Sequence, residues 1–296
     1  MPVNPMSTFP PLVVIVGATA SGKSALAMEV ARQWDGEIIA ADSRTVYKGM
    51  DIGTAKPTAE DQAHVRHHLL DIRNPDEHFS AAEFKQLAET AIKNISGRGK
   101  LPILVGGTGL YVDAILYDYQ FGPAADMQKR AYLDTLSVEV LQEMCRQRAI
   151  ALPVNKNNRR HLIRALELGG LRNDLKKLRA STLIVGITTK RERLRERIAA
   201  RAHNMIEKGI VGEVEAVGKK YNWHGEALKG NIYRIFRDVV EGKMSLGEAT
   251  EASIRSDMAL AKRQMTWFKR NSDIVWSENP EELLGKVGIF LHQQHL

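Results

Sequence analysis

The feature that most constrains the fold is a phosphate-binding loop that directly follows an apolar run near the start of the chain. Residues 12–16 are all apolar, and Gly17, Gly22, Lys23 and Ser24 then match the pattern G-x-x-x-x-G-K-[S/T]. A chance match in a chain of this length has a probability of about 1%. Apolar residues at helical spacing follow the loop. The sequence therefore predicts a strand, a glycine-rich loop and a helix, with the loop amides and the helix N-terminus facing an anion.

The loop predicts a phosphate site in which each residue type has a role. Backbone N–H groups cradle phosphates, Lys23 adds a point charge, and the Ser24 hydroxyl can hold magnesium. A nucleotide is the usual ligand, but the loop itself reads only two linked phosphates. A glycine-rich turn that binds nothing is the alternative. The predicted diphosphate- or nucleotide-binding residues are Gly17, Ala18, Thr19, Ala20, Ser21, Gly22, Lys23 and Ser24.

Composition restricts the class of protein. The chain has 296 residues, 26% of them charged, and a single cysteine, Cys145, so it has the composition of a globular protein from a reducing compartment. Its first residues lack the basic and apolar regions of a signal peptide. No apolar run approaches the roughly 20 residues that span a bilayer. We therefore expect a cytoplasmic protein with no membrane partner.

The net charge of +7 is concentrated in one region. Residues 146–201 hold sixteen Lys and Arg against four Asp and Glu, so the rest of the chain is net negative. Such an asymmetry indicates a polyanionic partner, above all a nucleic acid. Solvated helix faces are the alternative explanation for this segment.

Alternating strands and helices predict an α/β protein with a parallel sheet. The clearest helix covers residues 79–95, where Ser80 and Glu83 form a capping box. Ligands of such sheets bind beyond the carboxyl ends of the strands. The predicted strands lie within residues 12–17, 37–43, 101–107, 181–189 and, as a late addition, 273–277.

The strand pattern stops after Tyr119 and resumes at Leu183, and polar sequence of helical character lies between. This pattern predicts a helical insertion at residues 120–179, which holds much of the basic segment. The P-loop α/β core then comprises residues 1–119 and 180–296, with a mostly helical C-terminal part.

Two polar residues follow predicted strands of the core. Asp42 can hold magnesium, accept a proton from a nucleophile, or cap the next segment. Thr108 follows two glycines, which let the backbone approach a ligand, so its hydroxyl contacts either a phosphate or an amine, or caps a helix.

From these residues alone, two functions remain. One is a P-loop kinase of a small molecule. The other is an enzyme whose loop holds a diphosphate while the basic insertion binds a nucleic acid. A non-catalytic nucleotide-binding switch would leave the placement of Asp42 and Thr108 unexplained.

Five stretches, in this order, resemble the tRNA dimethylallyltransferases, also called tRNA isopentenyltransferases. They are GATASGKSALA, ADSRTVYKGMDIGTAKP, VGGTGLYVDAIL, RRHLIRALEL and LAKRQMTWFKR, and the similarity runs over residues 12–270. The resemblance implies transfer of the dimethylallyl group from dimethylallyl diphosphate to the exocyclic amine of the adenosine 3′-adjacent to the anticodon in tRNA, with magnesium as cofactor. It also implies that the loop holds the diphosphate of the donor, which is the leaving group, rather than ATP.

The resemblance assigns roles to further residues. Asp42 matches the family's base, Thr19 and Thr108 match residues near the reacting groups, and Arg234 matches an arginine near the diphosphate. The residues that it places against the anticodon stem-loop of tRNA are Asp42, Ser43, Arg44, Thr45, Thr108, Arg130, Arg160, His161, Leu162, Ile163 and Arg164.

The chain departs from the family pattern at several positions. Ile232 stands where the family has glycine, and Thr45 where glutamine is common. Asp257 and Met258 replace a Thr-Arg pair, and residues 155–158 replace a His-Pro-Asn-Asp stretch. The insertion is also shorter than usual for the family.

Overall fold

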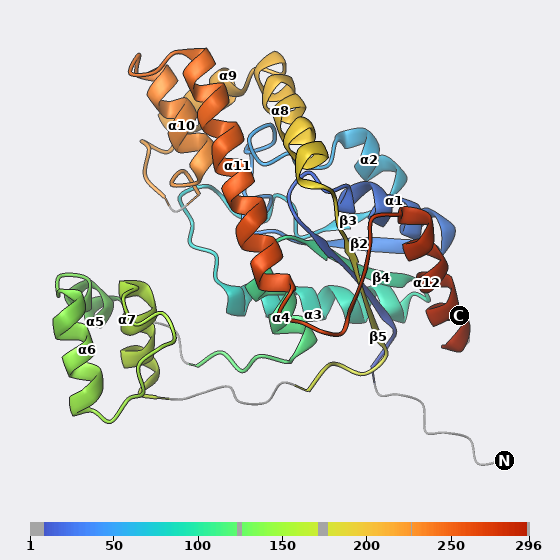
Figure 1. Cartoon of the computed structure of the whole chain (residues 1–296), viewed down its shortest axis with the longest axis horizontal. Helices are drawn as coiled ribbons and strands as arrows, with labels where there is room; N and C mark the ends of the chain where they lie inside the picture. The colour runs from blue at the N-terminus through green and yellow to red at the C-terminus, as the bar shows by residue number, and fades with distance from the viewer. Residues whose placement is uncertain (1–8, 123–125, 171–176, 226, 295–296) are drawn as a thin grey trace. The chain divides into compact units, whose positions relative to one another are not determined.

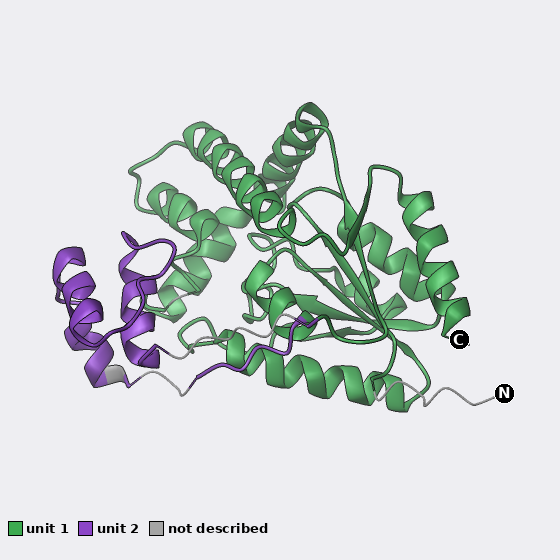
Figure 2. Cartoon of the chain, turned by 60° about the horizontal axis from the view of Figure 1, so that its bottom comes forward, with its two compact units in different colours: residues 1–116, 178–296 green, residues 117–177 purple. Residues whose placement is uncertain are grey.

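The computed structural model describes residues 9–122, 126–170, 177–225 and 227–294. The chain forms two compact units, one of residues 1–116 with 178–296 and one of residues 117–177 (Figure 2). These limits lie within three residues of the insertion expected at residues 120–179.

The first unit is built on a six-stranded parallel sheet in the order β3-β2-β4-β1-β5-β6 (Figure 1). Its strands are β1 (Leu12–Gly17), β2 (Gly36–Ala41), β3 (His67–His68), β4 (Leu101–Gly106), β5 (Thr182–Ile187) and β6 (Ile274–Ser277). Every residue of β1, β2 and β4 is buried, which explains why these strands are largely apolar runs rather than alternating ones, with the buried Glu37 of β2 as an exception. The predicted parallel α/β fold is confirmed, and β3 is a two-residue strand that the pattern did not predict.

Helices cover the sheet and form most of the C-terminal part. The helices of this unit are α1 (Lys23–Gln33), α2 (Ala59–His64), α3 (Ala81–Gly97), α4 (Gly109–Leu116), α8 (Arg191–Glu207), α9 (Ile210–Lys220), α10 (Asn231–Val240), α11 (Leu246–Phe268) and α12 (Pro280–Gln293). The Ser80–Glu83 capping box at the start of α3 is confirmed. Among the described helices, none combines the length and the apolar character that crossing a membrane requires.

Apolar cores on both sides of the sheet stabilise the first unit, and two of them are described by their residues. Val13 and Ile15 of β1 pack in one core with residues of α1 and α12, so the intervening Val14 faces the other side of the sheet. Helices α8 to α11 share a second core, which includes Phe236 of α10. These helices make up the helical C-terminal part that the sequence predicted.

The second unit is helical and contains α5 (Met127–Leu133), α6 (Val138–Gln147) and α7 (Arg159–Leu168). Its apolar residues form a core of their own, which buries the single cysteine of the chain. The buried members of this core are Leu133, Leu141, Cys145, Ile150, Leu162, Ile163 and Leu166.

The register of the sheet brings three loops of the first unit together. Val16 of β1 and Ala41 of β2 both lie beside Gly106 of β4, at the carboxyl ends of the strands. The P-loop, Asp42 and Thr108 therefore leave the sheet at the same edge, where parallel sheets bind their ligands.

Candidate active site

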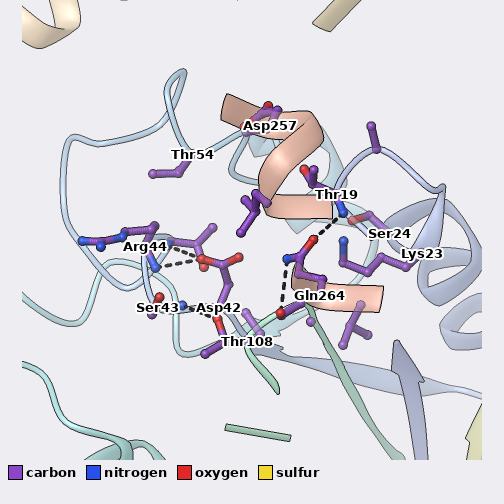
Figure 3. A pocket seen from close by; sticks show the side chains of 18 of the residues that line it. Thr19, Lys23, Ser24, Asp42, Ser43, Arg44, Thr54, Thr108, Asp257 and Gln264 are labelled. Atoms are coloured by element: carbon purple, nitrogen blue, oxygen red, sulfur yellow. Dashed lines mark hydrogen bonds between the residues drawn. The ribbon is translucent and has the colours of Figure 1, made fainter. Parts of the chain in front are cut away.

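A cavity of about 900 Å³ lies at this edge of the sheet (Figure 3). The P-loop contributes one part of its lining, and Asp42 and Thr108 contribute another. Helices α8, α10 and α11 and the segment of residues 53–57 supply further parts of it. The structure thus brings together the residues that the sequence placed after three different strands.

The P-loop presents an open helix N-terminus to this cavity. Gly22 has φ +106°, a backbone conformation that favours glycine, and α1 begins at the next residue without a side-chain cap. The amides of the first helical turn are therefore available to an anion. The predicted loop residues that line the cavity are Thr19, Ala20, Gly22, Lys23 and Ser24, whereas Gly17, Ala18 and Ser21 are buried in the structure outside that lining.

Lys23 carries the charge of the loop in a weakly hydrated position. Its Nζ donates a hydrogen bond to the carbonyl oxygen of Ala18 at 3.0 Å. Burial lowers the pKa of Lys23 to about 8, Asp42 partly counteracts this fall, and Arg201 adds to it. An anion bound here would raise this pKa again, because it would compensate for the lost hydration.

Two arginines of α8 complete the cationic part of the cavity, and sequence reasoning missed both. Arg201 donates from Nη1 to the hydroxyl oxygen of Thr19 at 2.8 Å. Arg197 donates from Nη1 to the carbonyl oxygen of Ser21 at 2.9 Å. Their spacing of four residues puts both on one face of the helix that follows β5. That spacing, in a helix starting at the carboxyl end of a strand, was the signal available in the sequence.

Asp42 has the capping role that the sequence left open, and one of its carboxylate oxygens stays open to the cavity. Its Oδ1 accepts the backbone N–H groups of Arg44 at 2.7 Å and Thr45 at 3.3 Å, which is the capping role. No hydrogen bond within the described residues reaches Oδ2, although the side chain lines the cavity. One carboxylate oxygen therefore fixes the loop, and the other remains available to a ligand.

Thr108 lies beside Asp42 but does not cap a helix through its side chain. Its hydroxyl oxygen accepts the backbone N–H of Ser43 at 3.1 Å (Figure 3). The hydroxyl therefore keeps its own hydrogen for donation into the cavity. The five residues of the core that were expected to contact the tRNA all line this cavity, and they are Asp42, Ser43, Arg44, Thr45 and Thr108.

Helix α11 adds two further polar residues that the sequence reasoning did not place in the site. Gln264 accepts the N–H of Thr19 at 2.7 Å and donates to the carbonyl oxygen of Gly107 at 3.1 Å. Asp257, at a position where the family has a different residue, is buried in the lining. Burial raises the pKa of Asp257, and the positive charge of Arg201 opposes this rise.

The structure does not place Arg234 in the cavity lining, so its position near the diphosphate stays a prediction. Arg234 is exposed on α10, a helix that contributes Asn231, Ile232 and Tyr233 to the lining. The apolar residues of α10 form its buried face, and Arg234 lies outside that face. The Tyr233 hydroxyl donates to Glu213 at 2.6 Å, and Glu213 also accepts the backbone N–H groups of residues 51–53. This carboxylate fixes one wall of the cavity.

The expected tRNA-binding residues of the insertion divide into two groups. Arg160 and His161 are exposed on α7. Leu162 and Ile163 are 0% and 2% exposed in the core of the second unit, so direct contact of these two side chains with tRNA is contradicted. The apolar spacing of α7 in the sequence already indicated this burial, because apolar residues at helical spacing on an amphipathic helix face inward.

The remaining two arginines of the insertion share one acidic partner. Arg130 makes a bidentate pair with Glu167, with distances of 2.7 and 2.8 Å. Arg164 donates to the same carboxylate at 3.2 Å. The Glu167 side chain is 4% exposed and the arginines are about one third exposed, so the outer faces of two guanidinium groups are held in place by one buried carboxylate.

The chain is similar to known proteins over most of its length. The family model of the IPP transferases matches residues 45–271. The tRNA dimethylallyltransferase of Desulforudis audaxviator is 40% identical over 299 residues, with 96% of both chains covered. That of Bacillus licheniformis is 37% identical over 285 residues, with 91% of both chains covered.

Solved structures agree with this result. The tRNA isopentenylpyrophosphate transferase of Bacillus halodurans superposes with a TM-score of 0.74 at 34% identity, covering 96% of this chain and 98% of its own. A eukaryotic dimethylallyltransferase acting on tRNA, at 24% identity and a TM-score of 0.76, shares the fold, over 90% of this chain and 73% of its own. Sequence and structure thus point to the same group of proteins, and the chain belongs to the IPP transferase family.

Proposed function

We propose that this protein transfers the dimethylallyl group from dimethylallyl diphosphate to the exocyclic amine of the adenosine 3′-adjacent to the anticodon in tRNA. The relatives that match most of the chain are named tRNA dimethylallyltransferases, which supports this activity. The observation that carries the proposal is a single cavity with two chemically different parts. One part is a cationic P-loop site, and the other presents the carboxylate of Asp42 beside the hydroxyl of Thr108.

The cationic part suits a diphosphate leaving group. An allylic diphosphate ionises readily because the carbocation is delocalised, so the main requirement is to stabilise the charge that develops on the departing oxygen. Lys23, Arg201 and the open amides of α1 offer fixed positive charges and dipoles for this purpose. Because they are already in place before the reaction, little reorganisation is needed.

Magnesium is the proposed cofactor, and the residues present fit it. Magnesium takes most of its ligands from water and phosphate oxygens, so one protein hydroxyl suffices in a diphosphate site. Ser24 supplies such a hydroxyl in the cavity lining. When bound, the ion neutralises negative charge on the diphosphate.

The other part of the cavity suits an amine nucleophile. The adenine amine is a poor nucleophile because its lone pair is shared with the ring. Oδ2 of Asp42 accepts a proton from the amine as the new carbon–nitrogen bond forms and the carbon–oxygen bond to diphosphate breaks. The Thr108 hydroxyl donates to the base edge and orients it. The diphosphate leaves with the electron pair of the broken bond, so charge and atoms balance.

The tRNA is recognised through its anticodon stem-loop in this proposal. A base in a loop is more easily unstacked than one in a duplex, so it can enter a closed cavity at a lower energetic cost. Arg130, Arg160, His161 and Arg164 present polar or charged groups at the surface of the insertion, where phosphates can pair with them. We place the protein in the cytoplasm, where its buried free Cys145 stays reduced.

The alternative, a P-loop kinase of a small molecule, is not favoured by the relatives. The test is to incubate the protein with magnesium, unmodified tRNA and dimethylallyl diphosphate, then to digest the tRNA and weigh its nucleosides. We expect an adenosine heavier by one dimethylallyl group, and none with tRNA whose target adenosine is replaced. Phosphate transfer from ATP to a small molecule, with no prenylated adenosine, would reverse the conclusion.

A further inference from the structure

One side chain joins the two parts of the cavity. The amide of Gln264 accepts the N–H of Thr19 through Oε1 at 2.7 Å, and donates through Nε2 to the carbonyl oxygen of Gly107 at 3.1 Å (Figure 3). Thr19 belongs to the P-loop after β1, and Gly107 directly precedes Thr108 after β4. The amide thus spans the ends of two neighbouring strands from a helix late in the chain.

Glycines in the loop after β4 leave space for side chains of α11. A Cβ atom at Gly107 would lie 2.2 Å from Nε2 of Gln264, and one at Gly109 would lie 2.3 Å from Cδ1 of Trp267. The indole N–H of Trp267 also donates to Asp113 at 2.9 Å. Two glycines therefore accommodate two side chains one helical turn apart, which fixes the position of the glutamine amide.

The two hydrogen bonds of Gln264 form a bridge, and the residue at each end of this bridge is linked to a group that the reaction needs. On the P-loop side, the hydroxyl oxygen of Thr19 accepts a hydrogen bond from Arg201 at 2.8 Å. On the other side, Thr108 accepts the N–H of Ser43, the residue directly after Asp42. The leaving-group site and the proton acceptor are thus connected through hydrogen bonds and short backbone links, with Gln264 at the centre.

We infer that Gln264 is a positioning residue that sets the spacing between the departing diphosphate and the accepting carboxylate. This inference rests on the proposed function. The reacting atoms must lie about 3–3.5 Å apart, and a displacement of about 1 Å lowers the rate roughly 10²-fold. The Gln264 amide offers both the acceptor and the donor that the two bonds need, whereas a carboxylate cannot donate to the Gly107 carbonyl and an alkyl group can do neither.

The first test separates positioning from binding. Gln264→Leu removes both hydrogen bonds, and we expect the single-turnover prenylation rate to fall about 10²-fold. Affinities for inorganic diphosphate and for tRNA should stay close to those of the parent, because neither ligand contacts the amide in this proposal. Gln264→Glu keeps the bond to Thr19 and should lie between the two.

A control on the same helix is available. Thr266 is exposed, and its hydroxyl donates only to the carbonyl oxygen of Lys262 in its own helix. Thr266→Ala should therefore retain the parental rate. An unchanged rate in Gln264→Leu, or a loss of diphosphate affinity as large as the loss of rate, would overturn the positioning role.

The second test uses the glycine that faces the amide. Gly107→Ala should reproduce the loss seen in Gln264→Leu, because the added methyl group displaces Nε2. In a Gln264→Ala background the atoms that the methyl group meets are gone, so the second substitution should add little further loss. The double-mutant cycle should thus be strongly non-additive. Rate losses that multiply would show that the two residues act independently, and would overturn the bridge.

Unfolding temperatures of the same set of variants, which do not depend on prenylation activity, separate this inference from the proposed function. A parent protein that forms no prenylated adenosine would overturn the proposed function alone. The Gln264–Gly107 bridge would then be judged by unfolding temperatures, where non-additive changes support it and additive changes overturn it.

Discussion

Replacing Lys23 by methionine should stabilise the fold while removing activity. Burial holds the pKa of Lys23 at about 8, against an ordinary value of 10.5. Between these pH values the unfolded chain binds more protons than the folded chain, so the free energy of unfolding rises with pH across this window. Below pH 8 both states are protonated, and the fold carries the full cost of the buried charge.

The size of this cost follows from the pKa difference. One pKa unit corresponds to 1.36 kcal/mol, so Lys23→Met should stabilise the protein at pH 7 by at most about 3 kcal/mol. The gain should vanish above about pH 10.5, where the parental lysine is neutral in both states. The carbonyl oxygen of Ala18, which loses the lysine as a donor, still accepts the N–H of Ser21 at 3.2 Å. Methionine also has nearly the length of lysine, so no large void opens.

Activity should move in the opposite direction. Removing one preorganised charge that faces a developing anion costs roughly 2.7–4 kcal/mol, which lowers the single-turnover rate about 10²–10³-fold. In the parent, affinity for inorganic diphosphate should fall as pH rises through 8, because the free lysine loses its proton there. Lys23→Met should lack this pH dependence.

The assay combines urea unfolding at pH 7 and pH 10, single-turnover prenylation, and calorimetric titration with diphosphate. Lys93→Met is the control, because Lys93 is exposed on α3 outside the cavity lining. A Lys23→Met variant that is less stable than the parent at pH 7 would refute the argument from burial. An unchanged single-turnover rate would refute the assignment of the reacting diphosphate to this loop.

Three further changes test other parts of the molecule. Asp42→Asn should lower the single-turnover rate about 10²–10⁴-fold. The melting temperature and the tRNA affinity should change little, because the amide oxygen can still accept the N–H of Arg44. Full activity of this variant would refute the role of Asp42 as base. Arg160→Gln should remove one phosphate contact, which reduces the log–log slope of tRNA affinity against salt concentration by about 0.7–0.9. An identical slope in the variant and the parent would show that Arg160 of α7 is solvated and does not contact tRNA. Hydrogen bonds from Arg98 lower the pKa of Glu37 to about 2, so the stabilising contribution of Glu37 should be lost as pH falls from 4.5 to 2. In urea unfolding, Glu37→Gln should therefore lose less stability than the parent over this pH range. An unaltered pH profile would contradict the pairing of Glu37 with Arg98.

The sequence by itself determined the parts of this protein that depend on short-range order. The P-loop spacing, the apolar strand runs and the Ser80–Glu83 box each involve residues within one element or one turn, where residue type largely dictates backbone conformation. The parallel sheet followed, because alternating strands and helices have few other ways to bury their apolar faces. Asp42 and Thr108 could be expected at one edge for the same reason, since parallel strands end together.

The direction in which a helical side chain points was only partly available from the sequence. The resemblance to a family placed Arg234, Leu162 and Ile163 at ligands, but the structure exposes Arg234 outside the cavity lining and buries the other two. For α7 the apolar spacing indicates the buried face, so the pattern could have corrected the resemblance. For α10 the apolar spacing also indicates the buried face, but it does not show that part of this face lines the cavity.

The tertiary structure alone decided which distant segments complete the site. Gln264 reaches Thr19 across 245 residues of sequence, and Arg201 reaches the same residue across 182. Such contacts depend on how α8 and α11 pack against the sheet, and that packing depends on the summed shape of many side chains rather than on any local pattern. The same holds for Asp42, where the folded loop uses one carboxylate oxygen for capping and leaves the other without a hydrogen bond from the described residues. Local chemistry thus sets which groups are present, and long-range packing sets the distances at which they act.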